Sequence, residues 1–593
     1  MTRFGVWAPD HHSVDLVLDD RRVAMSPSPS PPSGSSASSA PDGWWAVEVA
    51  DAGAGTRYRF SVDGGSPRPD PRSPSQPDGP EAPSAVVDHS SYQWGDQAWH
   101  GRPLASAVLY ELHVGTFTEA GTFDAVIERL DYLVDLGVNA IELMPVAEFP
   151  GVRGWGYDGV DLWSPHHAYG GPEGLKRLVD AAHARGLAVV LDVVYNHLGP
   201  SGNYLAEFGP YFTDRYRTPW GSAVNFDGAG SDGVRSFVVD NACAWFDHYH
   251  IDGLRLDAVH AIFDESALHI LEELAVRVDA LAAHLGRTLW LIAESDRNDP
   301  KLVRSREVGG FGLDASWSDD FHHSLHALLT GEQTGYYADF GSLTLVAGCY
   351  QRVYALGRDY SAFRRRHHGR PVGSLAGTRF LGYLQNHDQV GNRAFGERSA
   401  ALMSPGRLRV GAALVLLSPF VPMLFQGEEW AASTPFLYFT DHQDPELGRA
   451  IREGRRREFP TEGVGAHQVP DPQDPATHAA SVLRWKEIDE PEHREMLAWY
   501  RRLIGLRATY PELTDGRLSA VAVDFDEDAG WMRVRRGRIV LACNVGDRHA
   551  EVELGNEQPA ALLAVSGSAE LRGSRERGEK VTLPPDSVAV LEV

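Results

Sequence analysis

The sequence is poor in cysteine. Cys243, Cys349 and Cys543 are the only three cysteines among its 593 residues, and they lie far apart. Three distant thiols form neither the closely spaced pairs of a metal site nor a framework of disulfides, so both are excluded. Because a chain without disulfides suits a reducing compartment, we expect a cytoplasmic protein.

Positive charge is also scarce. Lys and Arg total 55 against 81 Asp and Glu, which gives a formal net charge of −26. Proteins that bind nucleic acid or anionic lipid usually carry a basic face, so neither partner is expected. A neutral substrate is compatible with this charge balance.

No long apolar segment is present. The start of the chain, Met1–Asp15, lacks the apolar core of a signal peptide. The longest apolar stretch, Val410–Phe425, is interrupted by prolines and is too short to span a bilayer comfortably. We expect it to form a buried helix followed by a buried strand.

Hydrophobic residues make up 43% of the chain and aromatic residues 10%, which is ample for packed cores. In the first ninety residues, Val14–Leu18 and Trp45–Val49 alternate apolar and polar side chains as strands do. Between them, the Ser- and Pro-rich segment Ser26–Ala40 predicts a mobile surface loop. We predict an N-terminal β-sandwich over residues 1–90, of a carbohydrate-binding-like kind, and a linker over residues 91–105.

From about residue 106 the pattern changes. Short apolar runs alternate with helix-period segments, which predicts a parallel sheet covered on both faces. The runs are Val108–Leu112, Ala140–Met144, Leu187–Val194, Gly253–Leu256, Leu289–Ile292, Phe380–Leu384 and Val421–Phe425. They extend beyond the roughly 250 residues of a plain eightfold barrel, so the prediction is an α/β fold, a (β/α)8 TIM barrel over residues 106–510 with inserted loops. The longest insertion is expected between Leu198 and Val239.

The end of the chain again looks strand-rich. Met532–Asn544 and Val581–Leu591 predict a small C-terminal β-sandwich over residues 519–593.

Polar residues stand where four of the apolar runs end. These residues are Asp192, Asn196 and His197 after one run, Arg255 and Asp257 after the next, then Glu294, and finally Asn386, His387 and Asp388. In a parallel barrel the carboxyl ends of the strands form the active site. Any one such residue is commonly a cap or a turn residue, but four such places in one sheet favour a functional site.

The spacing of these residues suggests their chemistry. Arg255 and Asp257 are two apart, so on an extended segment they point the same way, and the arginine can keep Asp257 ionised. If Glu294 lies near Asp257 and Asp388, like charges raise its pKa and keep it protonated. One ionised and one protonated carboxyl group suit the cleavage of a glycosidic bond.

Aromatic residues agree with a sugar site, because flat rings stack on the apolar faces of sugars. Trp155 and Tyr157 lie between glycines after the second run, and further candidates are Tyr204, Trp220, Trp317 and Trp430. For any single tryptophan, packing in the core is the commoner role.

Four short motifs together resemble those of the α-amylase superfamily of retaining glycoside hydrolases. They are DVVYNH (Asp192–His197), GLRLDAVH (Gly253–His260), IAES (Ile292–Ser295) and QNHD (Gln385–Asp388). The resemblance extends to the trehalohydrolase branch through Tyr110–Phe123, Met144–Gly159, Asp319–Phe340, Gln385–Arg393 and Met423–Trp430.

The resemblance implies a role for each matching residue. Asp257 matches the nucleophile, Glu294 the general acid and base, and Asp388 the carboxylate that stabilises the transition state. The matching substrate-binding positions are Tyr157, His197, Arg255, His260, Asp319, Asp320, His322, His323, His387, Gln389 and Asn392. Val259 stands before His260 where many amylases have lysine, so one sugar contact of those enzymes is missing.

The implied activity is hydrolysis of maltooligosyl trehalose by water, with release of trehalose through a retaining mechanism. Two alternatives share part of this pattern. A branching or amylase-type enzyme would carry the same three carboxylates, whereas a catalytically dead binding protein would have lost at least one.

No cofactor is implied. Asn196 stands where some amylases have a calcium ligand, but a hard cation needs about six to eight oxygens, and the sequence offers no such set. We therefore expect no metal. The sequence does not indicate an oligomeric state.

Overall fold

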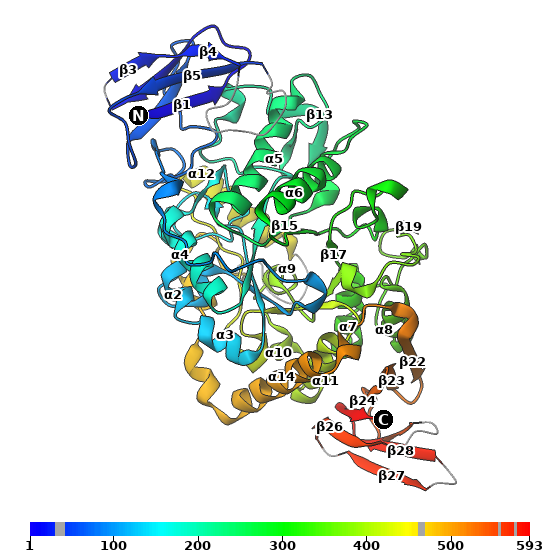
Figure 1. The fold of residues 1–593 in the computed structure, drawn as a ribbon. Coiled ribbons are helices and arrows are strands. Elements are labelled where there is room, and N and C mark those ends of the chain that lie inside the picture. The colour runs from blue at the N-terminus through cyan, green and yellow to red at the C-terminus, as the bar shows by residue number, and fades with distance from the viewer. Residues whose placement is uncertain (20, 30–41, 460–468, 555–558, 568, 575–577) are drawn as a thin grey trace.

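The centre of the molecule is a closed barrel of parallel strands, with a β-rich region at each end (Figure 1). The computed structural model describes residues 1–19, 21–29, 42–459, 469–554, 559–567, 569–574 and 578–593. The barrel strands pair in chain order, and the last pairs with the first to close the ring. They are β8 (Leu109–Leu112), β9 (Ala140–Leu143), β12 (Ala188–Val193), β15 (Gly253–Leu256), β16 (Trp290–Ala293), β17 (Ala315–Trp317), β20 (Phe380–Gly382) and β21 (Val421–Phe425).

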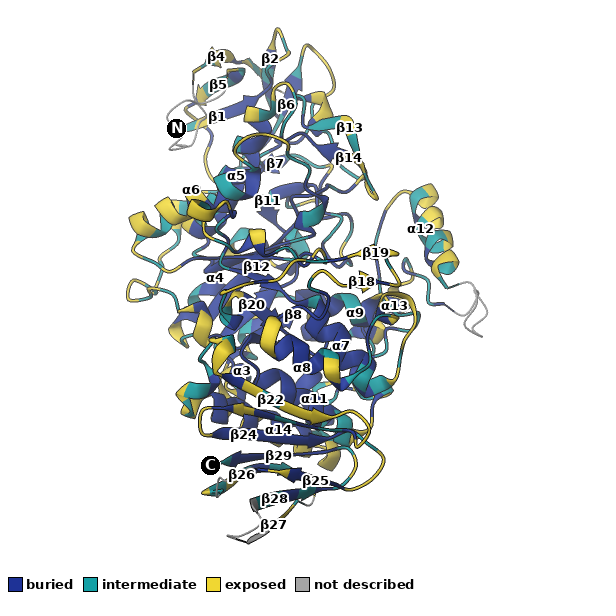
Figure 2. Ribbon diagram, turned by 90° about the vertical axis from the view of Figure 1, so that its right-hand side faces the viewer, coloured by how far each residue is buried: buried dark blue, intermediate teal, exposed yellow. Residues whose placement is uncertain are grey.

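The predicted barrel is confirmed, and seven of its eight strands fall on the apolar runs of the sequence. Every residue of these strands is buried (Figure 2). Helices cover the outside of such a barrel, and side chains fill its inside. The eighth strand, β17, is only three residues long, too short to show a period in the sequence. Val410–Phe425 forms the end of a helix and then β21, as expected.

Helices surround the barrel in all connections but one. They are α1 (Val114–Phe117), α2 (Phe123–Ile127), α3 (Leu130–Leu136), α4 (Gly171–Ala184), α5 (Ser231–His248), α6 (Ile270–Leu285), α7 (Asp319–Thr330), α8 (Leu343–Arg352), α9 (His387–Gly391), α10 (Ser399–Leu402), α11 (Pro405–Leu416), α12 (Pro445–Glu458), α13 (Pro475–Ser481) and α14 (Pro491–Thr509). Between β16 and β17, residues 294–314 are all described and contain two short 3-10 turns but no α-helix.

The prediction of the longest insertion is wrong. The segment after β12 does carry an insertion, the hairpin of β13 (Phe212–Thr218) and β14 (Gly221–Val224). A longer segment, residues 426–490, separates β21 from α14 and carries α12 and α13. Helix α12 is strongly polar, with five arginines and few apolar residues, so its sequence does not stand out as an element that packs on the barrel.

The N-terminal region forms two sheets, in the orders β1-β5-β4 and β3-β2-β6-β7. Their strands are β1 (Thr2–Trp7), β2 (Val14–Leu18), β3 (Arg21–Ala24), β4 (Ser26–Ser28), β5 (Trp44–Val49), β6 (Arg57–Val62) and β7 (Ser84–Ala85). The prediction that Ser26–Ala40 is a loop is wrong at its start, because Ser26–Ser28 pairs with β5 at the sheet edge, where proline is tolerated. Residues 30–40 of that segment lie outside the described residues.

The segment predicted as a linker is bound to the barrel. Trp99 stacks on His183, with ring centroids 4.7 Å apart, and its indole N–H donates to Asp252 Oδ1 at 2.7 Å. Asp252 immediately precedes β15, so this segment crosses the amino-terminal end of the barrel. We call residues 94–100 the strap.

The C-terminal region also forms two sheets, in the orders β22-β23-β24-β29-β26 and β25-β28-β27. Their strands are β22 (Val521–Asp526), β23 (Trp531–Arg536), β24 (Ile539–Asn544), β25 (Ala550–Glu553), β26 (Ala561–Ser566), β27 (Glu570–Ser574), β28 (Gly578–Leu583) and β29 (Ser587–Glu592). In the part of the chain that the structure describes, no helix combines the length and apolarity that crossing a membrane requires.

Candidate active site

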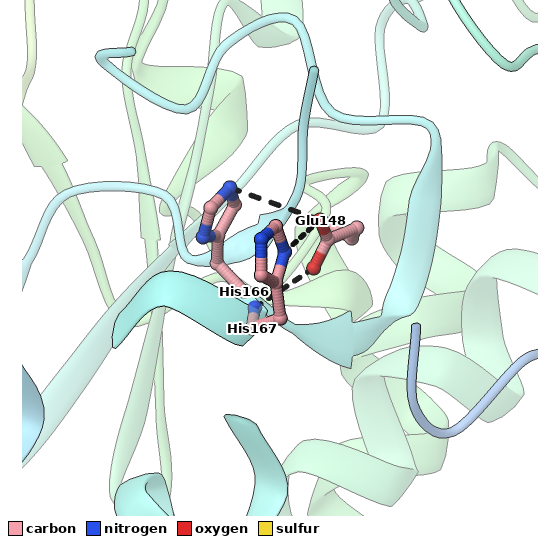
Figure 3. A group of neighbouring side chains, drawn as sticks. All are labelled: Glu148, His166 and His167. Atoms are coloured by element: carbon pink, nitrogen blue, oxygen red, sulfur yellow. Dashed lines mark hydrogen bonds and ion pairs between the residues drawn. The ribbon is translucent and has the colours of Figure 1, made fainter. Parts of the chain in front are cut away.

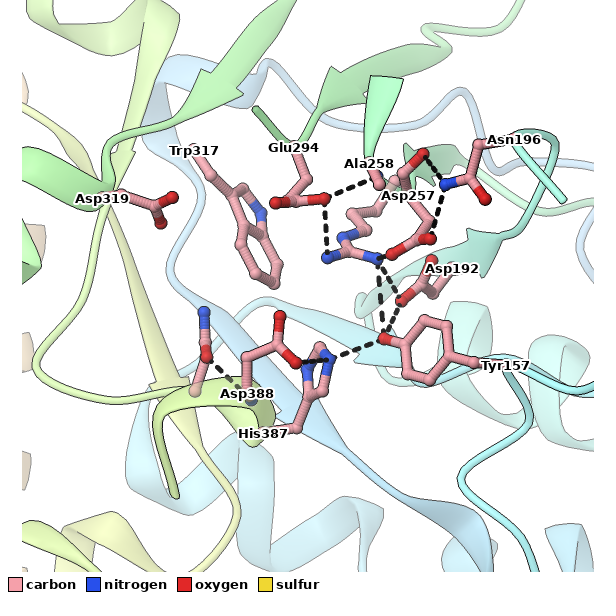
Figure 4. Close-up of polar contacts among 12 residues, drawn as sticks. Tyr157, Asp192, Asn196, Asp257, Ala258, Glu294, Trp317, Asp319, His387 and Asp388 are labelled. Carbon is pink, nitrogen blue, oxygen red and sulfur yellow. Dashed lines mark hydrogen bonds and ion pairs between the residues drawn. The ribbon is translucent and has the colours of Figure 1, made fainter. Parts of the chain in front are cut away.

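The three predicted catalytic carboxylates meet at the carboxyl ends of the barrel strands (Figure 4). Asp257 directly follows β15, and Glu294 directly follows β16. Asp388 lies in the first turn of α9, just after β20. Parallel strands in register deliver the residues that follow them to one edge, which is why these three separate segments meet.

Arg255 connects the acidic groups of the site. Its Nη1 atom lies 2.7 Å from Asp257 Oδ1 and 2.8 Å from Asp192 Oδ2. Its Nη2 atom lies 3.6 Å from Glu294 Oε2. The arginine side chain is fully buried, so water screens these interactions only weakly.

Asp257 is held as a carboxylate. Burial raises the pKa of Asp257, but the charge of Arg255 and a hydrogen bond from Asn196 outweigh it, so the net pKa is below its ordinary value. The Asn196 amide donates to Asp257 Oδ2 at 2.7 Å and to the Asp257 carbonyl at 2.8 Å. Asn196 therefore orients the predicted nucleophile, and its amide oxygen faces His197 Nδ1.

Glu294 is held as a protonated acid. Burial is the main cause that raises the pKa of Glu294 well above its ordinary value, and the charges of Asp257, Asp319 and Asp388 add to it. The predicted rise in the pKa of Glu294 has the right direction, but the prediction gave like charges as its only cause and did not include burial. The backbone N–H of Ala258 donates to Glu294 Oε2 and fixes the position of the carboxyl group.

His387 is held as a cation. Although burial opposes its charge, the Glu111 carboxylate and Asp388 raise the pKa of His387 to about 9. Its Nδ1 donates to Glu111 Oε1 at 2.5 Å and its Nε2 to the Tyr157 hydroxyl at 2.7 Å. Tyr157 in turn donates to Asp192 Oδ2 at 2.6 Å. The Asp388 side chain is 43% exposed and lies 3.6 Å from His387, so it is open to a ligand.

Other predicted substrate-binding residues surround this group. The His197 ring lies 3.1 Å from the Tyr157 carbonyl and stacks on Trp220, with centroids 4.3 Å apart. Asn392 donates to Asp388 at 3.3 Å. Asp319 accepts a hydrogen bond from Tyr383, and burial raises the pKa of Asp319 to about 7.

Some predicted contacts are engaged within the protein instead. His322 uses both ring nitrogens, for the Leu384 carbonyl and the Tyr337 hydroxyl. The Asp320 carboxylate accepts the backbone N–H of Leu356 at 2.7 Å. The Gln389 side chain accepts the N–H of Asn386 in a capping box that starts α9. His322, Asp320 and the side-chain oxygen of Gln389 are thus engaged within the protein, and contact of these three residues with a sugar stays a prediction.

His323 and His260 make fewer polar contacts. The His323 ring is buried among Tyr336, Tyr337 and Phe340. The Nδ1 atoms of His323 and His260 have no hydrogen-bond partner among the described residues. Substrate contact by these two histidines stays a prediction.

Two acidic residues of the site were missed by the prediction, although Asp192 was noted at a strand end. Glu111 lies within β8 and binds His387, and Asp192 lies within β12 and binds Arg255. Burial raises the pKa of Asp192 to about 6. The available signal was a carboxylate inside an apolar run, as in VLYEL, because a buried charge requires a partner.

A cluster of Glu148, His166 and His167 near the site has the residue types of a metal centre (Figure 3). However, Ala168 N–H donates to His166 Nδ1 at 3.1 Å, which places the ring proton on Nε2. That nitrogen faces Glu148 Oε1 at 3.8 Å, and a protonated nitrogen offers no lone pair to a metal. Glu148 also accepts a hydrogen bond from His167 Nδ1 at 2.7 Å. The cluster therefore joins the segments on either side of loop 149–160 by a hydrogen bond.

Comparison with known proteins agrees with this geometry. Residues 90–218 match the family described as "Alpha amylase, catalytic domain", and residues 516–590 match a domain of unknown function, DUF3459. The chain is similar to the malto-oligosyltrehalose trehalohydrolase of Arthrobacter ramosus, with 51% identity over 92% of this chain and 93% of the relative. The protein of that name from Rhizobium sp. (strain M-11) is 47% identical, over 99% of this chain and 97% of the relative.

A crystal structure of a protein from Salmonella typhimurium superimposes with a TM-score of 0.88 at 38% identity, covering 100% of this chain and 97% of that one. The relatives cover both β-rich ends as well as the barrel, so the similarity is not confined to the catalytic motifs. The chain belongs to the malto-oligosyltrehalose trehalohydrolase family, within the α-amylase superfamily.

Proposed function

We propose that this protein hydrolyses maltooligosyl trehalose, an α-1,4-glucan whose end is an α,α-1,1-linked trehalose unit. The α-1,4 bond next to that unit is cleaved and trehalose is released. The observation that carries this proposal is one buried arginine shared by an ionised Asp257 and a protonated Glu294, in a chain whose relatives are named for this activity.

In the first step, Glu294 gives its proton to the oxygen of the scissile bond, and trehalose leaves with that oxygen as a hydroxyl. Asp257 attacks the anomeric carbon and forms a covalent glycosyl ester. In the second step, Glu294, now a carboxylate, takes a proton from water, and the resulting hydroxide displaces Asp257. Two inversions retain the anomeric configuration.

The surrounding residues have separate tasks in this mechanism. Asn196 and Arg255 hold Asp257 ionised for attack, and the Ala258 N–H holds Glu294 in place. Asp388, partly exposed beside the cationic His387, faces the sugar and balances the positive charge that develops at its ring. Tyr157 and His197 border the same subsite.

We also propose a cytoplasmic location and no nucleic-acid or membrane partner. The three cysteines, all within the described residues, are free thiols, which suits a reducing compartment. The net charge of −26 disfavours polyanionic partners.

The test compares two substrates of equal length, maltotriosyltrehalose and maltopentaose, with wild type and Glu294→Gln. Wild type is expected to release trehalose rapidly from the first and to attack the second slowly. Glu294→Gln is expected to lower both rates by about 10²–10⁴-fold, because it removes general acid catalysis.

The possible outcomes separate the alternatives. Equal cleavage of both substrates would make the protein a general amylase, and new branched products would make it a transferase. No turnover of either substrate would indicate a binding protein. Normal turnover by Asp257→Ala would remove the assignment of the nucleophile.

A further inference from the structure

The indole of Trp317, labelled in Figure 4, lies against the guanidinium of Arg255. The Cζ atom of Arg255 is 4.4 Å from the ring centroid. Trp317 is 2% exposed and Arg255 is 0% exposed, so the contact is sheltered from water. A cation over an aromatic face gains most when it is desolvated in this way.

The hydrogen bonds of Arg255 leave its orientation incompletely fixed. Both of its close carboxylate contacts, to Asp192 and Asp257, use the single atom Nη1. Its Nε and Nη2 atoms have no hydrogen-bond partner among the described residues. A guanidinium that is attached through Cδ and hydrogen-bonded at Nη1 alone can still tilt about the line that joins these two atoms, and the 3.6 Å contact of Nη2 with Glu294 is too long to prevent it, so another contact is needed to set its plane.

The indole face supplies that contact. The other nearby ring, that of Tyr157, lies 6.0 Å from Arg255 Cζ and is therefore the weaker partner. Trp317 also packs edge-to-face on His387, with centroids 6.2 Å apart, and lies 5.4 Å from Tyr383, which binds Asp319. It ends the short strand β17, between the strands that deliver Glu294 and Asp388.

We propose that Trp317 is a positioning residue for hydrolysis, whose cation–π contact fixes the plane of Arg255 and thereby the orientation of Asp257 and Glu294. This inference rests on the proposed function, because it assigns Asp257 and Glu294 their roles. Trp317 acts through Arg255 and makes no bond in the reaction.

The first measurement separates attack by Asp257 from protonation by Glu294. α-Maltosyl fluoride needs no proton to expel its leaving group, so its rate reports formation of the glycosyl ester. Trp317→Leu, which removes the aromatic face, is expected to lower this rate on the order of 10–30-fold. Trp317→Phe keeps a smaller aromatic face and is expected to lower it less.

The second measurement keeps the shape of the side chain. Tryptophans carrying one to four ring fluorines, placed at position 317 alone, weaken the negative face of the ring stepwise. The rate is expected to fall with each fluorine, and the acid limb of the pH profile to move to higher pH as Arg255 stabilises the Asp257 carboxylate less. A role in packing alone would change neither.

Trp430 provides the matched control. The sequence lists it as a candidate for stacking on a sugar, but it is fully buried and its ring packs on Tyr132 and Trp485, so its role is in packing. Its indole N–H, like that of Trp317, lacks a partner among the described residues. Trp430→Leu is expected to lower thermal stability without changing the rate of the folded protein.

Equal rates across the fluorinated series would overturn the proposal, even if Trp317→Leu did not fold. Equal losses for Trp317→Phe and Trp317→Leu with an unmoved acid limb would also overturn it. If wild type hydrolyses the fluoride but releases no trehalose from maltotriosyltrehalose, the proposed substrate is wrong while the test of Trp317 stands. If wild type hydrolyses neither, both proposals fail.

Discussion

At the scale of single residues, the charge of Arg255 sets the pH range in which the site is correctly protonated. Activity requires an ionised Asp257 and a protonated Glu294, which gives a bell-shaped profile. Arg255 lowers the pKa of both groups against the effect of burial. Replacing Arg255 by Gln should therefore move both limbs of kcat/KM to higher pH, besides lowering the maximum.

Arg255→Lys is the control for this prediction, because it keeps the charge and loses the planar geometry. The maximum of its kcat/KM profile should fall, while the acid and alkaline limbs of that profile should move less than those of Arg255→Gln. Thermal unfolding of both variants would identify loss of folding, since Asp192 would remain buried without its partner. If the limbs of the pH profile of Arg255→Gln do not move, a charge other than that of Arg255 sets the pKa values of Asp257 and Glu294.

The sequence was sufficient to place Asp257, Glu294 and Asp388 at one edge of the barrel. Residues that directly follow parallel barrel strands lie together at the carboxyl-terminal face of the barrel. The sequence could not show that burial, more than like charge, raises the pKa of Glu294. Desolvation depends on the packing of the whole barrel mouth. For the same reason it did not reveal that both ring nitrogens of His322 and the side-chain oxygen of Gln389 form hydrogen bonds inside the protein.

At the scale of elements, the strap is held through His183, a buried histidine that lies between two carboxylates. His183 Nδ1 lies 2.8 Å from Asp96 Oδ2 and its Nε2 lies 2.9 Å from Asp252 Oδ2. Burial opposes the charge, but the two carboxylates raise the pKa of His183 above its ordinary value. A raised pKa stabilises the fold below the pKa of the unfolded state, and this stabilisation is lost as pH rises through the folded pKa.

Wild type should therefore be more stable than His183→Gln below pH 6.5, and this difference should shrink as pH rises through the folded pKa of His183. The neighbouring charged groups are His250, which shares Asp96, and Arg287, which lies 3.0 Å from Asp252. Urea unfolding at a series of pH values measures the difference. The exposed His284 of α6 gives the control variant His284→Gln. A constant difference across the series would mean that His183 is neutral in the fold.

Helices and strands were predictable where their apolar residues recur at a regular spacing. The seven apolar runs became barrel strands, whereas the three-residue β17 and the missing fifth helix left no pattern to find. The strap lies in the segment 91–105, which the sequence predicts as a linker, because its polar and aromatic residues match the period of neither a helix nor a strand. Its binding depends on partners far along the chain, such as Asp252.

At the scale of the whole molecule, buried arginines join the C-terminal sheets to the barrel. Arg536, at the end of β23, donates to the carbonyls of Leu417, Ser418 and Leu513 at 3.1, 2.6 and 3.0 Å. Removing the guanidinium leaves these carbonyls without that donor. Arg536→Leu should lower the free energy of unfolding by roughly 2–4 kcal/mol and should make the C-terminal region more sensitive to limited proteolysis.

Arg535 is the matched control for Arg536, because it precedes it in β23 and its side chain is exposed on the other face. Arg535→Gln should change the unfolding free energy by less than about 0.5 kcal/mol. If both variants are equally stable, the sheets are held to the barrel mainly by apolar packing.

The closure of the barrel by β21 against β8 has a consequence for biosynthesis. Leu424 pairs with Tyr110, so one edge of the first barrel strand lacks its partner until the ribosome has made the chain past β21. At about 5–20 residues per second, that interval is roughly 15–60 s. For that time the nascent chain carries an open apolar strand edge, which makes an unfinished chain prone to aggregation and a substrate for chaperones.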